Sequence, residues 1–63
     1  MEENDLHRLK MYELYLENTI ETNKEKAKKY SSLETDKLVE NQIILDVKNK
    51  LNIYFPELKD YKI

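Results

Sequence analysis

A short stretch in the middle of the chain, SSLETDKLVENQ, concentrates hydroxyl, carboxylate and amine groups within residues 31–42. On a helix, side chains three and four residues apart share one face. That spacing joins four residues of the stretch, Ser32, Thr35, Asp36 and Val39. The shared face would present hydroxyl and carboxylate oxygens beside an apolar margin, either as a surface that acts on another molecule or as an ordinary exposed helix turn.

Other side chains with chemical potential have simpler interpretations. His7 is the only histidine, and a solvated side chain near a helix end is its ordinary interpretation. Four lysines within residues 24–29 form either a solvated face or a binding site for an acidic partner. Cysteine is absent, which excludes disulfides and thiolate metal sites, and the sequence shows no metal-ligand spacing and no glycine-rich phosphate loop.

Composition indicates one small helical domain. A chain of 63 residues buries only about 60% of its unfolded surface, so good helix packing or a partner subunit must stabilise it. Glycine is absent and Pro56 is the only proline, which argues against sheets joined by tight turns.

The charge balance and apolar pattern exclude further classes of protein. Eleven Lys and Arg residues against thirteen Asp and Glu residues give a net charge of −2, which does not favour nucleic acid as a partner. The longest apolar run, residues 43–45, is too short to cross a bilayer. The opening MEENDLHRLK lacks the apolar region of a signal peptide. We therefore expect a cytoplasmic protein with no membrane span and no nucleic-acid partner.

The chemistry-bearing stretch must be positioned by helices. Apolar residues recur at helical spacing at Leu6, Leu9, Leu16 and Ile20. This pattern predicts a helix over residues 5–20, and the Thr and Asn residues at 21–24 predict a turn before a second helix over residues 25–54. A turn at residues 31–32 is the alternative, because SSLE is a second capping-box pattern. Both placements give an all-α, two-helix antiparallel hairpin.

The second half of helix 2 carries more apolar residues than one partner helix can cover, since residues 43, 44 and 45 point in three directions. If helix 1 packs on the first half of helix 2, the stretch from 43 to 55 keeps an open apolar face, which is a candidate surface for a homodimer. Pro56 is expected to end the helix because its ring clashes with the preceding turn. The tail, residues 55–63, forms one short turn or remains loose.

The segment SLETDKLV, residues 32–39, resembles the signature of the small Spo-zero-E-like aspartyl-phosphate phosphatases of spore-forming bacteria. That signature reads Ser-Gln-Glu-Leu-Asp, one variable residue, then Leu and Ile or Val. The matching positions are Ser32, Glu34, Asp36, Leu38 and Val39. Leu33 and Thr35 depart from the glutamine and leucine of the signature, and the glycine common between the family's helices is absent. Upstream, KMYEL at residues 10–14 is similar to a helix 1 stretch of the family that ends in Glu-Leu.

The resemblance implies a helical hairpin that removes phosphate from the aspartate of a phosphorylated response-regulator receiver and so holds back sporulation. The acyl phosphate and the Mg²⁺ ion would belong to the receiver, so this chain would need no cofactor and no metal of its own. By position, Asp36, Ser32 and Glu34 would be the catalytic residues and would align water for in-line attack. The surface that binds the receiver would comprise Leu33, Thr35, Lys37, Leu38, Val39, Lys28 and Lys29.

The residues by themselves leave a different class of function open. A helical hairpin with spare apolar surface can also be a non-catalytic interaction module, as a homodimeric adaptor or a stoichiometric inhibitor. A dimeric hairpin that binds RNA is a third interpretation, which the acidic balance disfavours.

Overall fold

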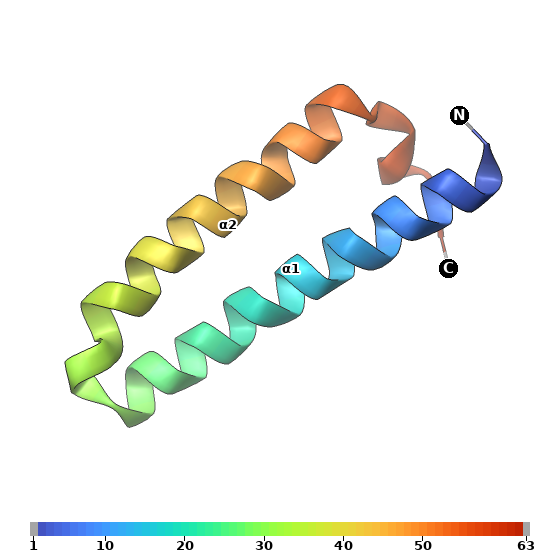
Figure 1. Ribbon diagram of the computed structural model, residues 1–63. Coiled ribbons are helices and arrows are strands. Elements are labelled where there is room, and N and C mark those ends of the chain that lie inside the picture. Colours follow the sequence, from blue (N-terminus) through green and yellow to red (C-terminus); the bar gives the residue numbers. More distant parts are fainter. Residues whose placement is uncertain (1, 63) are drawn as a thin grey trace.

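The computed structural model describes residues 2–62 and shows two long antiparallel helices that are joined at one end by a short turn (Figure 1). Helix α1 spans Glu3–Lys29 and helix α2 spans Glu34–Tyr54, and each is followed by a short 3₁₀ helix, η1 (Ser31–Leu33) and η2 (Pro56–Lys59). The hairpin measures 43 Å by 19 Å by 14 Å, so it is a flat rod with two long faces. The predicted all-α helical hairpin is confirmed.

The turn lies at Tyr30 and not at residues 21–24, where it was predicted. Tyr30 has an extended backbone (φ −125°, ψ 95°), whereas α1 continues without a break through the expected turn. The reason is visible at Asn23, which is only 4% exposed and lies against α2. Its side-chain amide donates hydrogen bonds to Glu40 (3.2 Å) and Asn41 (3.0 Å). The polar residues interpreted as a turn therefore make a contact between the helices.

Charge at the helix ends explains why the chain turns at Tyr30. Three lysines occupy the last turn of α1, and two carboxylates, Glu34 and Asp36, occupy the first turn of α2. Cations at a carboxyl end and anions at an amino end both stabilise the helix dipole. The alternative placement of the turn, at residues 31–32, is close to the observed one. The stretch SSLETDKLVENQ covers η1 and the beginning of α2, and does not lie in the interior of a second helix.

Helix α2 ends before Pro56, as predicted. The residue before a proline is disfavoured in the helical region, and Phe55 accordingly adopts φ −129° and ψ 71°. The tail then folds back as η2, so the expectation of one short turn is met, and Leu58 is completely buried. The last residue of the predicted tail, Ile63, lies outside the described residues.

The core is a thin seam between the two helices and η2. Among the described residues, Leu16 and Leu58 are the apolar side chains that are buried. The half-buried apolar residues that extend the seam are Leu6, Leu9, Ile20, Ala27, Ile44, Val47, Leu51 and Phe55. Most of the apolar packing thus stays in partial contact with water, as expected for so short a chain.

Because the turn comes late, α1 is long enough to pack along all of α2, and the premise that it covers only the first half was wrong. The expected open apolar surface is nevertheless present, since Ile43 is 61% exposed and Ile53 and Tyr54 are each 72% exposed. Within residues 2–62, neither helix is both long and apolar enough to pass through a membrane.

Candidate functional site

The predicted motif occupies the turn end of the hairpin. Ser32 lies in η1, and Thr35, Asp36 and Val39 lie in the first turns of α2, all exposed. Leu33 is half-buried, and its backbone N–H donates to the carbonyl of Tyr30 (2.9 Å). The structure therefore presents the Asp36 carboxylate on an open surface and not inside a cavity.

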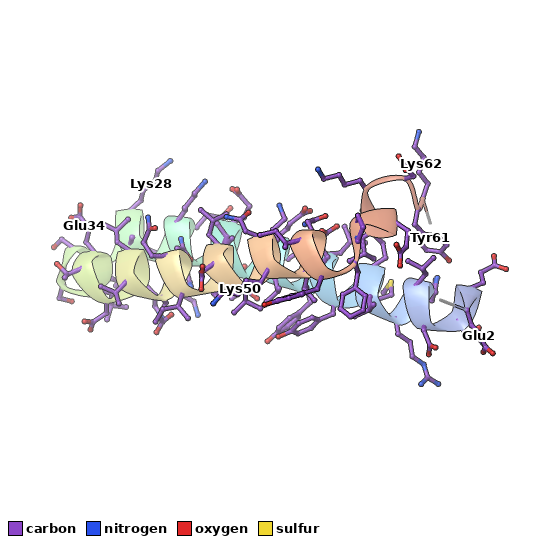
Figure 2. The ribbon with its side chains drawn as sticks, turned by 90° about the horizontal axis from the view of Figure 1, so that it is seen from above. Glu2, Lys28, Glu34, Lys50, Tyr61 and Lys62 are labelled. Atoms are coloured by element: carbon purple, nitrogen blue, oxygen red, sulfur yellow. The ribbon has the colours of Figure 1, made fainter. Side chains whose placement is uncertain are left out.

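The predicted residues divide between two sides of α2. Residues 36 and 38 are separated by about 200° around a helix axis, so Asp36 and Leu38 point in nearly opposite directions. Leu38 and Glu34 line a shallow groove of about 360 Å³ together with Lys24, Ala27, Lys28 and Ser31. Lys28 and Glu34 project to the same edge of the hairpin (Figure 2). The structure thus brings Lys28, Glu34 and Leu38 together and keeps Asp36 apart from them.

The two remaining predicted cations, Lys37 and Lys29, are directed to local partners. The Lys37 ammonium pairs with Glu40 at 3.3 Å, and its side chain is only 19% exposed. The Lys29 ammonium lies 5.6 Å from the centre of the Tyr30 ring, a cation–π contact at the turn. Both lysines stay near the motif, but neither faces the groove around Leu38.

His7 is exposed near the beginning of α1, as predicted, and it also makes a contact that the sequence did not indicate. Its Nδ1 atom lies 3.1 Å from the Tyr61 hydroxyl, and the two rings meet edge to face. The contact ties the tail that follows η2 to the first turns of α1. His7 is therefore a structural contact between segments that are far apart in the sequence.

Sequence reasoning missed the most buried charged residue of the chain's described part, Glu13. Its carboxylate is 4% exposed and accepts hydrogen bonds from the Lys10 ammonium (2.9 Å) and the Asn52 amide (2.8 Å). The Lys10 ammonium also donates to the backbone carbonyl of Leu58 (3.3 Å). One carboxylate thus joins α1 to α2, and its cation holds η2 in place.

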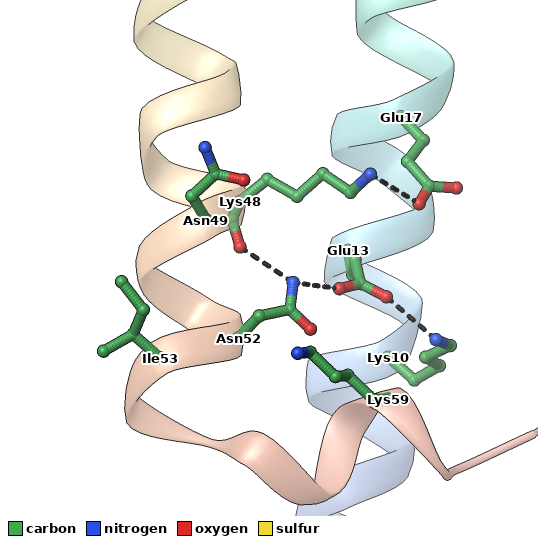
Figure 3. A pocket seen from close by; sticks show the side chains of 8 residues that line it. All are labelled: Lys10, Glu13, Glu17, Lys48, Asn49, Asn52, Ile53 and Lys59. Carbon is green, nitrogen blue, oxygen red and sulfur yellow. Dashed lines mark hydrogen bonds and ion pairs between the residues drawn. The ribbon is translucent and has the colours of Figure 1, made fainter.

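Glu13 lies at the floor of a second open groove of about 680 Å³, at the end of the hairpin away from the turn. We call it the Glu13 groove, and it is lined by Lys10, Glu13, Glu17, Lys48, Asn49, Asn52, Ile53 and Lys59 (Figure 3). Lys48 pairs with Glu17 across the helices at 2.9 Å. The spacing of Lys10, Glu13 and Glu17 along α1 could have indicated a charged side of the helix. The spacing does not show that the Glu13 carboxylate is buried and the Glu17 carboxylate is partly exposed.

The surroundings of Glu13 act on its pKa in opposite directions. Burial raises the pKa of the carboxyl, whereas hydrogen bonds from Lys10 and Asn52 and the charges of Lys10 and Lys48 lower it. The net result is a pKa below the ordinary value, so the carboxylate is ionised at neutral pH. Every partner that lowers the pKa is itself engaged in the packing of the hairpin, which marks Glu13 as a structural ion pair.

No family model, curated protein or solved structure matched the chain when it was compared with each of these. Function must therefore be argued from the surface itself. Nowhere in residues 2–62 do three or more His, Asp or Glu side chains gather closely enough to hold a metal ion.

The open position of the motif limits what it could do chemically. A solvated carboxylate and a hydroxyl on a convex helix end have no sheltered pocket in which to lower a reaction barrier by themselves. The same groups can act when they enter a cleft that another protein supplies. The turn end of the hairpin lies at one extremity of the molecule (Figure 1) and carries Asp36 in the first turn of α2, so it is placed to enter such a cleft.

Proposed function

We propose that this protein dephosphorylates the aspartyl phosphate of a response-regulator receiver and thereby acts as a negative regulator of sporulation. The proposal is supported by the exposed Asp36, which lies in the first turn of α2 near the tip of the hairpin, within the signature-like segment of residues 32–39. A tip of this kind can enter the shallow acidic site of a receiver, where the phosphoryl group and its Mg²⁺ ion are held.

The reaction is the hydrolysis of an acyl phosphate. Water attacks phosphorus in line with the bond to the aspartyl oxygen, that bond breaks, and the receiver carboxylate and inorganic phosphate leave. The proton lost by the water passes to the phosphate or to solvent. Catalysis in such transfers consists mainly of positioning and of charge stabilisation.

Asp36 would hold the attacking water by accepting a hydrogen bond from it. A carboxylate repels the phosphoryl oxygens, so it approaches them only where a cation intervenes, and the receiver's metal ion or a lysine supplies that charge. Ser32, one turn earlier, would donate a hydrogen bond near the same point. Glu34 points into the groove beside Lys28, so its role would be to position the docked receiver and not to touch the water.

Docking would use the sides of the tip. Leu38 and Val39 are 53% and 55% exposed, which leaves apolar area on both sides of α2 for a partner to cover. Lys28 at the groove would steer the tip towards the acidic pocket of a receiver, an effect that weakens as salt increases. Leu33, Thr35, Lys37 and Lys29 would complete the contact from the turn and the first turn of α2.

The decisive measurement is the decay of phosphate from a panel of phosphorylated receiver domains, with and without the protein. Asp36→Ala should abolish the acceleration while helix content by circular dichroism is unchanged, because the side chain is exposed. Asp46→Ala is the matched control, since Asp46 is also an exposed carboxylate of α2 but pairs with Lys50 (3.0 Å). Full activity of Asp36→Ala would contradict the assignment of Asp36.

A second candidate, a non-catalytic interaction module, is favoured by the apolar side chains left open on α2, Ile43 and Tyr54 among them. Turnover separates the two functions. A phosphatase at a tenth of an equivalent still empties the pool of phosphorylated receiver, whereas a stoichiometric inhibitor changes only the fraction that it binds. Binding without any loss of phosphate would replace the catalytic proposal by this one.

A further inference from the structure

One face of α2 repeats every three and four residues in the pattern of a helix–helix interface. We call it the α2 stripe, and its members are Asp36, Glu40, Ile43, Val47, Lys50 and Tyr54. Its two central residues are apolar: Ile43 is 61% exposed, and Val47, which also borders the seam between the helices, is half-buried. Acidic residues lie towards the beginning of the stripe and Lys50 towards its end.

Helix α1 adds two aromatic rings to the same flat side of the hairpin. Tyr12 and Tyr15 stack on each other with ring centres 6.4 Å apart, and Tyr15 is 63% exposed. Tyr15, Thr19 and Asn23 follow one another at four-residue spacing along one flank of α1, and Asn23 reaches Glu40 of the α2 stripe (3.2 Å). The α2 stripe and the two tyrosines therefore lie on one side of the molecule.

The opposite flat side is different in character. This side carries both grooves. Lys28 and Glu34 project from it, whereas Lys50 projects from the side with the α2 stripe (Figure 2). Its walls are formed largely by charged and amide side chains, with interhelix ion pairs such as Lys48–Glu17. The side with the α2 stripe instead presents Ile43, Tyr15 and Tyr54, which are 61%, 63% and 72% exposed.

We propose that a second copy of this chain covers the α2 stripe, with the two α2 helices antiparallel. Turned end for end about a point between Ile43 and Val47, the stripe is complementary to itself. Ile43 then meets Val47 of the second copy, and Glu40 meets Lys50. At the outer positions Asp36 meets the Tyr54 hydroxyl, which can donate a hydrogen bond to its carboxylate.

Charge selects this arrangement over others. A parallel pairing would place Glu40 against Glu40 and Lys50 against Lys50, which costs free energy at both positions. The antiparallel pairing places Glu40 of each copy against Lys50 of the other, so the dimer contains this ion pair twice, because a twofold axis repeats every contact. In the single chain Glu40 also contacts Lys37, and Lys50 contacts Asp46, so the charges of a dimer would form a network with these pairs.

The size of the face is sufficient for a specific dimer. A long face of the hairpin measures 43 Å by 19 Å, so a second copy that covers most of this face would approach the roughly 800 Å² per partner that standard interfaces bury. The thin core of the single chain gives a further reason for self-association. With few apolar side chains fully buried, covering a second face adds a substantial share of the total apolar burial.

The arrangement has a consequence for the proposed phosphatase, on which this step rests. Asp36 is both the first residue of the α2 stripe and the residue assigned to the reacting water. A second copy that covers the stripe would hide Asp36 from a receiver. Self-association and receiver binding would therefore exclude each other, and the active form would be the single chain.

The test uses charge exchange on the protein alone. Sedimentation of the wild type over a series of concentrations should show a monomer–dimer equilibrium. Glu40→Lys and Lys50→Glu should each weaken the dimer by about tenfold or more, because two attractive contacts become repulsive. An equimolar mixture of the two variants should form a dimer again, since the introduced lysine then meets the introduced glutamate and the unchanged Lys50 of one chain meets the unchanged Glu40 of the other.

Weakening by each exchange and recovery on mixing are together specific to the antiparallel pairing of positions 40 and 50. Loss of the Lys37–Glu40 contact inside one chain would weaken both the single variant and the mixture, so it predicts no recovery. Ile43→Asp should also abolish the dimer. Ile53→Asp is the matched control, because Ile53 is also open to solvent (72% exposed) but lines the Glu13 groove on the other side.

Three results would overturn the proposal: a wild-type monomer up to the limit of solubility, a dimer that neither charge exchange weakens, or a mixture that does not recover. Phosphate loss from a phosphorylated receiver is measured separately from the sedimentation experiments. Activity per chain of the wild type should fall as its concentration passes through the range of self-association, while that of Ile43→Asp stays constant. If the protein dimerises as proposed but neither the dilute wild type nor the monomeric Ile43→Asp variant dephosphorylates any receiver, the function is refuted and the interface is left intact.

Discussion

At the scale of single residues, the structure separates groups that hold the hairpin together from groups that are free to act. Glu13 is buried and has partners on both sides, whereas Asp36 is exposed in the first turn of α2. Both are carboxylates on helices of mixed charge, and their sequence surroundings do not distinguish them. What distinguishes them is their position around the helix axes, since Glu13 faces the other helix and Asp36 faces solvent.

Glu13 should make the stability of the protein depend on pH. Its pKa is lowered in the folded state, so its contribution is complete above the ordinary value of 4.5 and is lost as the pH falls through the folded pKa. Glu13→Gln should lower the free energy of unfolding by about 1–3 kcal/mol at pH 7, because Lys10 loses its buried partner. The difference from the wild type should shrink in acid, as urea titrations at several pH values would show.

Glu17→Gln is the control for that measurement. The Glu17 carboxylate pairs with Lys48 but is 43% exposed, so its removal should cost less than about 1 kcal/mol at any pH. Equal effects of the two changes would show that burial of Glu13 contributes nothing to its role.

At the scale of elements, the late turn decides which residues face one another. Helix α1 continues through Thr22 and Asn23 because the helix formers that follow extend it, and the buried amide of Asn23 is satisfied by α2. The break comes at Tyr30, between a run of cations and a pair of carboxylates. Polar residues at 21–24 resemble a turn only as long as the partner helix is not considered.

Two proline substitutions would locate the turn in solution. Thr22→Pro should destabilise the protein by about 3 kcal/mol, because it removes a helical hydrogen bond in the middle of α1. Ser31→Pro should be nearly neutral, since Ser31 is the first residue of η1 and Tyr30 before it already has the extended backbone that proline requires. Thermal melts followed by circular dichroism would compare them, and similar losses for both would contradict the observed turn.

The short helix η2 should behave as part of the core. Leu58→Ala should cost about 2–5 kcal/mol because the side chain is completely buried, a large share of the roughly 3–9 kcal/mol expected for a domain of this length. Leu45→Ala, at a position that is 42% exposed, is the matched control and should cost much less. Comparable unfolding midpoints in urea for both variants would show that the tail does not pack in solution.

At the scale of the whole molecule, the hairpin has two unlike sides and a tip. One side carries the grooves and interhelix ion pairs, the other the α2 stripe and the paired tyrosines, and the tip carries the motif. A flat, thinly packed rod of this kind gains most by covering its apolar side. The same geometry leaves the tip accessible only while that side is uncovered.

If a second copy covers the α2 stripe, thermal stability should depend on protein concentration. Association of folded chains favours the folded state by mass action, so Tm of the wild type should rise as the protein is concentrated. Tm of Ile43→Asp should stay constant over the same range. Scanning calorimetry at several concentrations would test this, and a constant Tm for the wild type would argue against association of the folded chains.

The sequence by itself determined the fold class, the end of α2 and the candidate motif. Apolar spacing from Leu6 to Ile20 requires a helix whatever its partner, and Pro56 ends a helix for reasons that are local to the chain. The matching positions of residues 32–39 are likewise a property of the sequence. Each of these conclusions depends on neighbours along the chain.

Only the tertiary structure decided the position of the turn, the burial of Glu13 and Asn23, and the division of the motif between two sides of α2. Each of these depends on the rotation and register of one helix against the other, which place Asn52 on Glu13 and Glu40 on Asn23. Register is set by contacts between residues far apart in the sequence, and several registers satisfy the same apolar pattern. This is the physical reason why the hairpin was predictable and the residues that fasten it were not.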